Sequence, residues 1–364
     1  MTEGRFRRIG RWMATACLLG ALLPGHASPP QDRADRHEDP DFAGLERLIV
    51  REMESAGVPG LSMAVIRDGA IVYRGAFGVT NLETGEPITE RTLFEAASLS
   101  KPVFAYFTML QVDKGLLDLD RPLHEYLPHE SLVPDPRHEL LTARMVLAHA
   151  SGLPNWRSET GGELKLLFEP GTRFGYSGEA YEYLKSVLGH ILRTDDEGLQ
   201  AHLKREVADP AGARYMQYTW DDAIPSLKAF GHRNGAVTDN DRHDRNFGAA
   251  YSLITTPSDY ARFLIALMRP VGSNAAVVED LLSLQTALPP ERGEMHRSLG
   301  FPVKKTGKGF RYYHSGNNGD FRAYCHFYRD TGDGVVIFGN SDNLFTSDLA
   351  GHVVEYLGDR WFYM

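Results

Sequence analysis

Two hairpin patterns at opposite ends of the chain constrain its fold more than any other feature of the sequence. The first covers residues 61–77, where two apolar runs flank the turn pair Asp68-Gly69. This composition is typical of a tight antiparallel turn. The second covers residues 323–340 and turns at 330–334. Because each hairpin needs partners to bury its apolar face, we expect the two ends of the chain to share one antiparallel sheet.

Helical periodicity dominates the middle of the chain, from residue 98 to about 268. A helix-like stretch at 42–56 precedes the first hairpin, and an amphipathic helix through 349–357 follows the second. The expected fold class is therefore α+β: an antiparallel β-sheet flanked by helices, formed by the N- and C-terminal parts, with a largely helical lobe inserted between them. The expected parts are sheet segments at about 58–92 and 296–364, and a helical lobe at about 93–295.

The first 27 residues have the composition of an export leader. Four arginines precede an apolar run at 12–23, and small residues around Ala27 offer a cleavage site. The apolar run is shorter than the roughly 20 residues needed to span a bilayer, which favours a cleaved signal peptide over an uncleaved anchor. We expect a secreted or periplasmic protein without a stable membrane span. Its expected parts are a signal peptide at 1–27, a flexible tail at 28–42 and one domain at 43–364.

The net charge and the cysteine content limit which molecules the protein is expected to bind and whether it can form a disulfide. The formal net charge is −9, and loss of the leader would make it more negative, so nucleic acid is not an expected partner. Cys17 would leave with the leader, and Cys325 remains without a disulfide partner. We expect Cys325 to be a small buried apolar side chain rather than a catalytic thiol. The sequence carries no pattern that indicates an oligomeric state.

No cofactor is expected. The sequence contains neither a phosphate-binding loop nor a dinucleotide-binding fingerprint. His149 has no second ligand at a spacing suited to a metal ion, so we expect it to be structural, with a hydrogen bond to the backbone near the site.

Ser98 and Lys101 are the first candidate catalytic residues. They open a predicted helix whose apolar stripe runs to Gly115. Positions three apart lie on one helical face, so the lysine amine can reach the serine hydroxyl. A serine hydroxyl needs a base to become a nucleophile, and a lysine can serve when it is desolvated. By itself this pair is more often a helix cap beside an exposed lysine.

Three segments around this pair make the catalytic interpretation stronger: 94–102 (FEAASLSKP), 115–123 (GLLDLDRPL) and 147–154 (LAHASGLP). In order and spacing they resemble the serine β-lactamase and penicillin-binding-protein-like family. The resemblance is closest to its branch of class C β-lactamases, D-alanyl-D-alanine carboxypeptidases and esterases, and covers most of residues 43–345. It implies that Ser98 is the acylated nucleophile and that Lys101 accepts its proton.

The family's second motif is a Tyr-x-Asn triplet, and residues 176–178 occupy its place. Tyr176 is present, and the resemblance implies that its phenol shares proton transfer with the lysine. The asparagine is replaced by Gly178. The resemblance implies that this side-chain amide contacts both the substrate carbonyl and the lysine. Its replacement argues against tight recognition of β-lactam or peptide amides.

The family's third motif is a Lys/His-Thr/Ser-Gly triplet on a strand beside the nucleophile, and two segments fit it. Residues 305–307 (Lys-Thr-Gly) have the β-lactamase spelling but lie in a turn composition, whereas 314–316 (His-Ser-Gly) lead into the second hairpin. We prefer 314–316 and expect 305–307 to be an exposed turn. The resemblance then implies that the Asn317 and Ser98 N–H groups form an oxyanion hole. The residues assigned to substrate binding and the oxyanion hole are His314, Ser315, Gly316 and Asn317.

The resulting hypothesis is a serine hydrolase that works through an acyl-enzyme on a small-molecule ester, peptide or β-lactam-like substrate. Its subtype stays open between a carboxylesterase and a D-amino-acid peptidase or carboxypeptidase, with a β-lactamase less favoured. The alternative is a penicillin-binding-like sensor or binding module that does not turn over.

Overall fold

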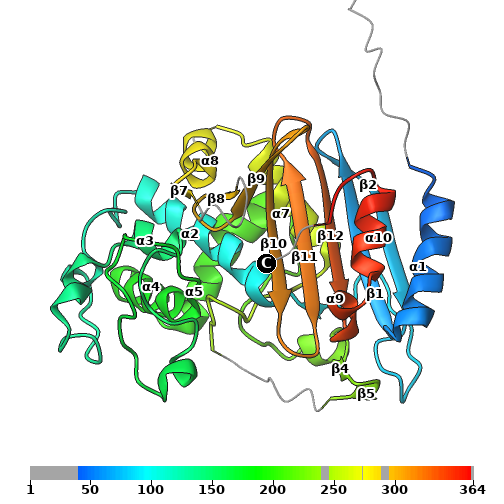
Figure 1. The fold of residues 1–364 in the computed structure, drawn as a ribbon, viewed down its shortest axis with the longest axis horizontal. Coiled ribbons are helices and arrows are strands. Elements are labelled where there is room, and N and C mark those ends of the chain that lie inside the picture. Colours follow the sequence, from blue (N-terminus) through cyan, green and yellow to red (C-terminus); the bar gives the residue numbers. More distant parts are fainter. Residues whose placement is uncertain (1–39, 239–245, 273, 288–294, 362–364) are drawn as a thin grey trace, which may run out of the picture. The chain divides into compact units, whose positions relative to one another are not determined.

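The two ends of the chain meet in one antiparallel sheet, as expected. The computed structural model describes residues 40–238, 246–272, 274–287 and 295–361. Among these residues, eight strands form the sheet in the order β2-β1-β12-β11-β10-β9-β8-β7 (Figure 1). The strands of the sheet are β1 (Gly60–Arg67), β2 (Ala70–Gly78), β7 (Thr286–Ala287), β8 (Met295–Arg297), β9 (Pro302–Thr306), β10 (Gly309–Asn317), β11 (Arg322–Tyr328) and β12 (Asp333–Gly339).

Both predicted hairpins are confirmed, and β1 and β12 join them at the centre of the sheet. Ser62 of β1 pairs with Phe338 of β12, and β11 pairs with the other side of β12. The first hairpin turns at Asp68 and Gly69, whose φ angles are 48° and 73°. A two-residue hairpin turn with positive φ at both positions matches the twist of the strands, which explains the Asp-Gly pair.

Helices cover both faces of the sheet, and the predicted first helix has the bounds 42–56 in the structure as well. The predicted helix after the second hairpin is also present, as α10. The helices are α1 (Phe42–Ala56), α2 (Ser100–Asp113), α3 (Ala143–Leu147), α4 (Gly178–Leu192), α5 (Asp196–Leu203), α6 (Asp209–Ala211), α7 (Pro257–Met268), α8 (Asn274–Leu282), α9 (Asn343–Thr346) and α10 (Leu349–Tyr356).

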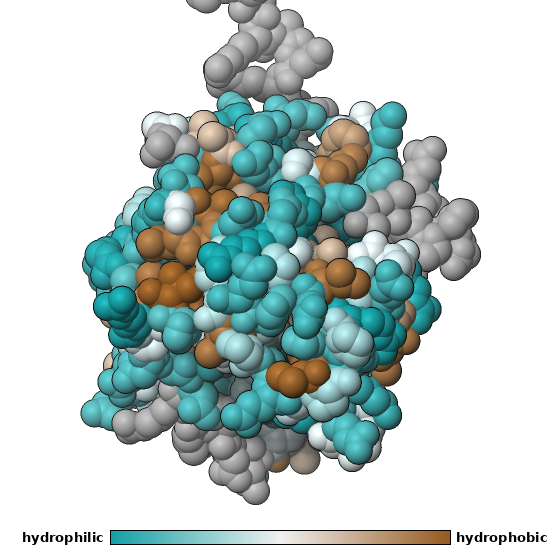
Figure 2. Space-filling model, turned by 90° about the vertical axis from the view of Figure 1, so that its left-hand side faces the viewer, coloured by the Kyte–Doolittle hydropathy of each residue, from teal (hydrophilic) through white to brown (hydrophobic). Residues whose placement is uncertain are grey.

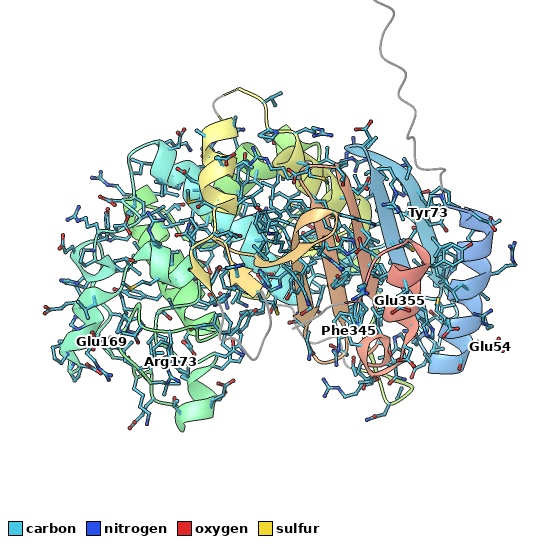
Figure 3. The ribbon with its side chains drawn as sticks, turned by 45° about the horizontal axis from the view of Figure 1, so that its top comes forward. Glu54, Tyr73, Glu169, Arg173, Phe345 and Glu355 are labelled. Atoms are coloured by element: carbon cyan, nitrogen blue, oxygen red, sulfur yellow. The ribbon has the colours of Figure 1, made fainter. Side chains whose placement is uncertain are left out.

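Two apolar clusters lie on opposite faces of the sheet. On one face, Leu45 and Ile49 of α1 pack with Val353 of α10. Figure 3 labels Glu54 on α1 and Tyr73 on β2 in this layer. On the other face, the larger cluster buries α2, α4 and α7, and Figure 1 shows α2 between the sheet and the helices of the lobe. The lobe was expected to be largely helical, and this expectation is confirmed.

Two short strand pairs lie within the lobe. β4 (His232–Arg233) pairs with β5 (Ala236–Val237). β3 (Phe94–Glu95) pairs with β6 (Ile254–Thr255). The second pair matters for the site, because it fixes the residues just before Ser98 against those that follow residue 250.

The surface of the lobe is mostly hydrophilic, with apolar patches separated by polar side chains (Figure 2). Leu116, Val133 and Leu167 are among its exposed apolar side chains. No helix among the described residues is long and apolar enough to cross a membrane. The predicted signal peptide and nearly all of the predicted tail lie outside the described residues. Cys325 is buried without a disulfide, as expected.

Candidate active site

Ser98 lies in a tight turn at the entrance of α2. The sequence predicted that Ser98 opens this helix, but the structure places it in a 3-10 turn, Ala97–Leu99, and the α-helix begins at Ser100. The Ser100 hydroxyl donates to the Ala97 carbonyl at 2.5 Å and closes the turn. Ala97 has a φ of 50°, a strained value for a residue with a side chain. The turn leaves Ser98 partly exposed between buried neighbours.

Lys101 reaches Ser98 from the first turn of α2, as the spacing predicted. Its Nζ lies 3.2 Å from the Ser98 Oγ and 2.9 Å from the Ala250 carbonyl oxygen. The side chain is almost fully buried, and Nζ stands over the rings of Tyr176 and Tyr181, 4.7 and 5.7 Å from their centroids. No carboxylate of the described residues forms an ion pair with it. Its two hydrogen-bond partners, the Ser98 hydroxyl and the Ala250 carbonyl, are both uncharged.

Tyr176 completes this cluster and stacks on His149. The two ring centroids are 4.3 Å apart with an interplanar angle of 26°. The His149 Nδ1 accepts a hydrogen bond from the Ser177 N–H at 3.1 Å, so His149 bonds to the backbone as expected. Burial, with the nearby Arg297 charge, holds the pKa of His149 well below its usual range. His149 is therefore a neutral support for Tyr176.

His314 lies behind Tyr176 on β10, with the two rings 6.4 Å apart. Its side chain is fully buried, and its Nδ1–H donates to the Ser315 carbonyl at 2.8 Å. Burial and the positive charges of Arg297 and Lys101 hold the pKa of His314 well below its usual range. The structure thus places a neutral imidazole where the family triplet has lysine or histidine, on the inner side of the strand.

Gly316 brings β10 against the turn that carries Ser98. A Cβ at this position would lie 2.5 Å from the Ala96 carbonyl oxygen and 3.1 Å from the Ala97 Cβ. Only glycine permits this approach. Ser315 is half-buried and Asn317 is exposed at the end of the strand. The four residues assigned to the third motif therefore lie on the strand that passes the Ser98 turn.

The competing triplet at 305–307 lies at the end of β9, where Lys305 and Thr306 pair with β10, and Gly307 begins the β9–β10 turn. Lys305 and Gly307 are exposed, and a Cβ built at Gly307 would meet nothing within 4 Å. The expectation of an exposed turn is therefore wrong for Lys305 and Thr306, which pair as strand residues, and holds for Gly307 alone. The strand that follows it is the same β10 that carries His314 at its far end.

Trp156 occupies the space beside Gly178. A Cβ at Gly178 would lie 2.8 Å from the Trp156 Cη2 and 3.0 Å from the Asn155 carbonyl oxygen. The Trp156 ring in turn meets the Tyr251 ring edge-on, 5.8 Å away. An asparagine at 178 would collide with this indole. The loss of the family amide is therefore coupled to an aromatic side chain 22 residues earlier, which sequence analysis did not single out.

Sequence analysis also missed Glu182 and Arg297. Glu182, on α4, accepts a hydrogen bond from the Ala250 N–H at 2.9 Å. Burial raises its pKa to about 7. Arg297, on β8, is fully buried with its guanidinium 5.4 Å from the Phe174 ring centroid, and burial lowers its pKa. A glutamate and an arginine without a motif give no signal of burial in the sequence.

Metal and thiol chemistry find no support in the described parts of the chain. No cluster of three or more His, Cys, Asp or Glu side chains there could hold a metal ion. Burial raises the pKa of the Cys325 thiol to about 12, which leaves it protonated and unreactive.

Comparisons with known proteins find relatives of this chain. The profile of the Beta-lactamase family matches residues 45–355. The chain is 30% identical over 201 residues to Esterase EstB of Burkholderia gladioli, across 47% of this chain and 50% of the esterase. It is 24% identical over 267 residues to a beta-lactamase of Yersinia enterocolitica, across 69% of this chain and 66% of that protein. The chain thus spans about half to two thirds of these relatives.

Solved structures show the same fold. The octameric penicillin-binding protein homologue from Pyrococcus abyssi superposes with a TM-score of 0.74 at 22% identity, covering 88% of this chain and 78% of that chain. The D-alanine carboxypeptidase AmpC from Burkholderia cenocepacia superposes with a TM-score of 0.73 at 18% identity, covering 87% and 99%. The predicted family and fold class are confirmed.

Proposed function

The chain belongs to the beta-lactamase family, and we propose that it is a serine hydrolase that acts on esters through an acyl-enzyme on Ser98. The family includes esterases, carboxypeptidases and beta-lactamases. The observation that carries the proposal is the contact of 3.2 Å between the buried Lys101 Nζ and the partly exposed Ser98 Oγ. Because the amine lies at hydrogen-bond distance from the hydroxyl, Lys101 is placed to act as the base that a serine nucleophile needs.

In the proposed reaction, the Ser98 Oγ attacks the ester carbonyl carbon while its proton passes to the Lys101 Nζ. The N–H groups of Ser98 and Asn317 stabilise the negative oxygen of the tetrahedral intermediate. The carbon–oxygen bond of the ester then breaks, and the leaving alkoxide takes the proton back through Lys101 and Tyr176. A water molecule hydrolyses the acyl-enzyme by the same steps in reverse, which releases the acid and restores Ser98.

Trp156 supports an ester over an amide substrate. Amide recognition in the family is expected to use the side-chain amide at position 178, and here Gly178 lies against an indole instead. Trp156 and Tyr251 offer apolar contact there, and the neighbouring Asn155 amide is engaged by the Gly178 N–H, which donates to its Oδ1 at 3.1 Å. We therefore rank ester hydrolysis first, a D-amino-acid peptidase or carboxypeptidase second, and a β-lactamase third.

Labelling with a fluorophosphonate tests the nucleophile. We expect one adduct, located on Ser98 by mass spectrometry and absent from Ser98→Ala, whereas the matched variant Ser186→Ala, at an exposed serine of α4, labels as the wild type does. An adduct that survives Ser98→Ala would overturn the proposal.

Steady-state assays then test turnover and substrate class. We expect sustained hydrolysis of p-nitrophenyl esters, slower reaction with nitrocefin and D-alanyl-D-alanine peptides, and a loss of about 10²–10⁴-fold in kcat/KM in Lys101→Met. A single burst of acylation without turnover would instead support the sensor.

We further propose that the protein is exported and that its leader is cleaved near Ala27, which the composition of the leader supports. N-terminal sequencing of the exported protein tests this proposal, and an intact leader would contradict it.

A further inference from the structure

A segment without helix or strand holds the second partner of Lys101. Residues 247–253 precede β6, and the Ala250 carbonyl within them accepts the hydrogen bond from the Lys101 Nζ at 2.9 Å. Side chains fix this segment in place of a regular backbone ladder: the Ser100 Oγ accepts from the Leu253 N–H at 3.0 Å, and Asp196 accepts from the Phe247 N–H at 2.9 Å. The position of the catalytic lysine therefore depends on the groups that anchor this loop.

Glu182 anchors the loop at the residue that contacts Lys101. Its Oε1 accepts from the Ala250 N–H at 2.9 Å, and Ala250 is fully buried. Ala250 thus forms both hydrogen bonds: its N–H donates to the Glu182 carboxylate, and its carbonyl accepts from the Lys101 amine. Because Ala250 has no exposed surface, removing this acceptor would leave a buried N–H without a partner. The same helix, α4, carries Tyr181, whose ring lies near the Lys101 Nζ.

Glu182 is also the group in this cluster that changes charge near neutral pH. Burial raises its pKa to about 7, and the Ala250 and Ala249 N–H groups, Lys185 and Lys101 oppose that rise. Burial raises the pKa of Tyr181 and of Tyr218, which also faces Glu182, so both phenols stay neutral.

On the far side of Lys101, the two histidines do not change charge near neutral pH as Glu182 does. His149 and His314 are held neutral because their pKa values lie well below the usual range. Arg297, whose charge lowers the pKa of both histidines, is itself fully buried, and burial lowers its pKa. The cluster therefore contains one acid, Glu182, whose charge varies over the range in which hydrolases work.

We propose that Glu182 is a positioning residue that holds the Ala250 carbonyl on Lys101 and that its negative charge governs how readily Lys101 gives up its proton. This inference rests on the proposed function, in which Lys101 is the base. A carboxylate nearby stabilises the ammonium form of Lys101, whereas the neutral acid does not. Glu182 would thereby restrain the nucleophile at higher pH, where the carboxylate is ionised.

Two substitutions separate the two roles. Glu182→Gln keeps an acceptor for the Ala250 N–H and removes the charge. We expect its maximal kcat for a p-nitrophenyl ester to stay within about threefold of the wild type, while the acidic limb of kcat/KM moves to lower pH by about 0.5–1 unit. Glu182→Ala removes both, and we expect a loss of at least about tenfold in kcat at every pH. Glu197→Gln, at an exposed glutamate of α5, is the control for loss of one negative charge and leaves the profile unchanged.

A Glu182→Gln profile that superimposes on the wild type would overturn the electrostatic role, and a Glu182→Ala enzyme with wild-type kcat would overturn the positioning role. Thermal unfolding of each variant identifies loss of fold: if Glu182→Ala unfolds, the Glu182→Gln profile decides. Fluorophosphonate labelling of wild-type Ser98 keeps the two proposals apart. If the wild type is labelled and active but the Glu182→Gln profile is unshifted, only this inference fails. If the wild type shows neither adduct nor hydrolysis, the proposed function fails.

Discussion

Gly316→Ala isolates the contact between β10 and the Ser98 turn. The added Cβ would lie 2.5 Å from the Ala96 carbonyl oxygen, about 1 Å closer than ordinary van der Waals contact allows. The φ of Gly316 lies outside the left-handed region, so the methyl group itself is the only obstacle. Overpacking of this kind costs about 1–3 kcal/mol of folding free energy. Relief requires the strand to move away from the turn.

Such a movement separates the two proposed oxyanion donors, the N–H groups of Ser98 and Asn317. Loss of one oxyanion donor typically lowers kcat by about 10²–10³-fold. We therefore expect Gly316→Ala to lose kcat on p-nitrophenyl esters by about that factor and to unfold about 1–3 kcal/mol more easily in urea. The matched control is Gly307→Ala, in the turn that leads into the same strand, where a Cβ meets nothing within 4 Å. Wild-type kcat in Gly316→Ala, with a stability equal to that of Gly307→Ala, would refute the reasoning.

Three further predictions test other parts of the protein. Lys228→Met removes the buried cation that lies 3.2 Å from Glu95. It should cost about 3–5 kcal/mol in urea unfolding, because the buried carboxylate loses this countercharge while the Asn318 amide still donates to it; a loss under 1 kcal/mol would contradict this. Burial lowers the pKa of His326 to about 3, so between pH 6.5 and 5 this histidine takes up a proton only in the unfolded chain, and the folded state loses stability as the pH falls. His326→Gln should remove roughly 2 kcal/mol of that loss. Stability curves of wild type and variant that run parallel over this range would contradict the prediction. Gly178→Asn should destabilise the protein by about 1–3 kcal/mol, and Trp156→Ala should relieve most of that loss in a double-mutant cycle; additive losses would contradict the collision.

The sequence could predict what depends on local patterns. The helix at 42–56 and the Asp68-Gly69 turn follow from periodicity and turn chemistry between neighbouring residues, and both appear at the predicted positions. The contact of Ser98 with Lys101 follows from a spacing of three on one helical face. The α-helix itself starts two residues later than predicted, because the Ser100 hydroxyl caps a 3-10 turn before it.

Contacts between distant segments could not be predicted in the same way. From the sequence, Gly178 indicates only that the asparagine side chain of the family motif is absent. In the structure, the Trp156 ring occupies the space that a side chain at position 178 would need. Glu182 looks in the sequence like one of many glutamates on a helix surface, whereas in the structure its carboxyl group accepts a hydrogen bond from the Ala250 N–H of the loop at 247–253. Burial of a charged side chain is decided by which segment packs over it, and this information lies in the fold as a whole rather than in any window of residues.

The site therefore separates into a local part and a non-local part. Two residues of one turn, Ser98 and Lys101, meet by local geometry alone, and in many proteins the same pair is a cap with a solvated amine. Here the lysine is buried because Tyr176 and the Ala250 carbonyl close over it, and a strand from the far end of the chain approaches the turn only because residue 316 is glycine. Burial of the amine, and the position of the strand that carries the proposed oxyanion donor Asn317, both depend on segments remote in sequence. A variant that loosens either remote segment should thus impair hydrolysis while the 3.2 Å contact persists, whereas the opposite result would locate catalysis in the turn alone.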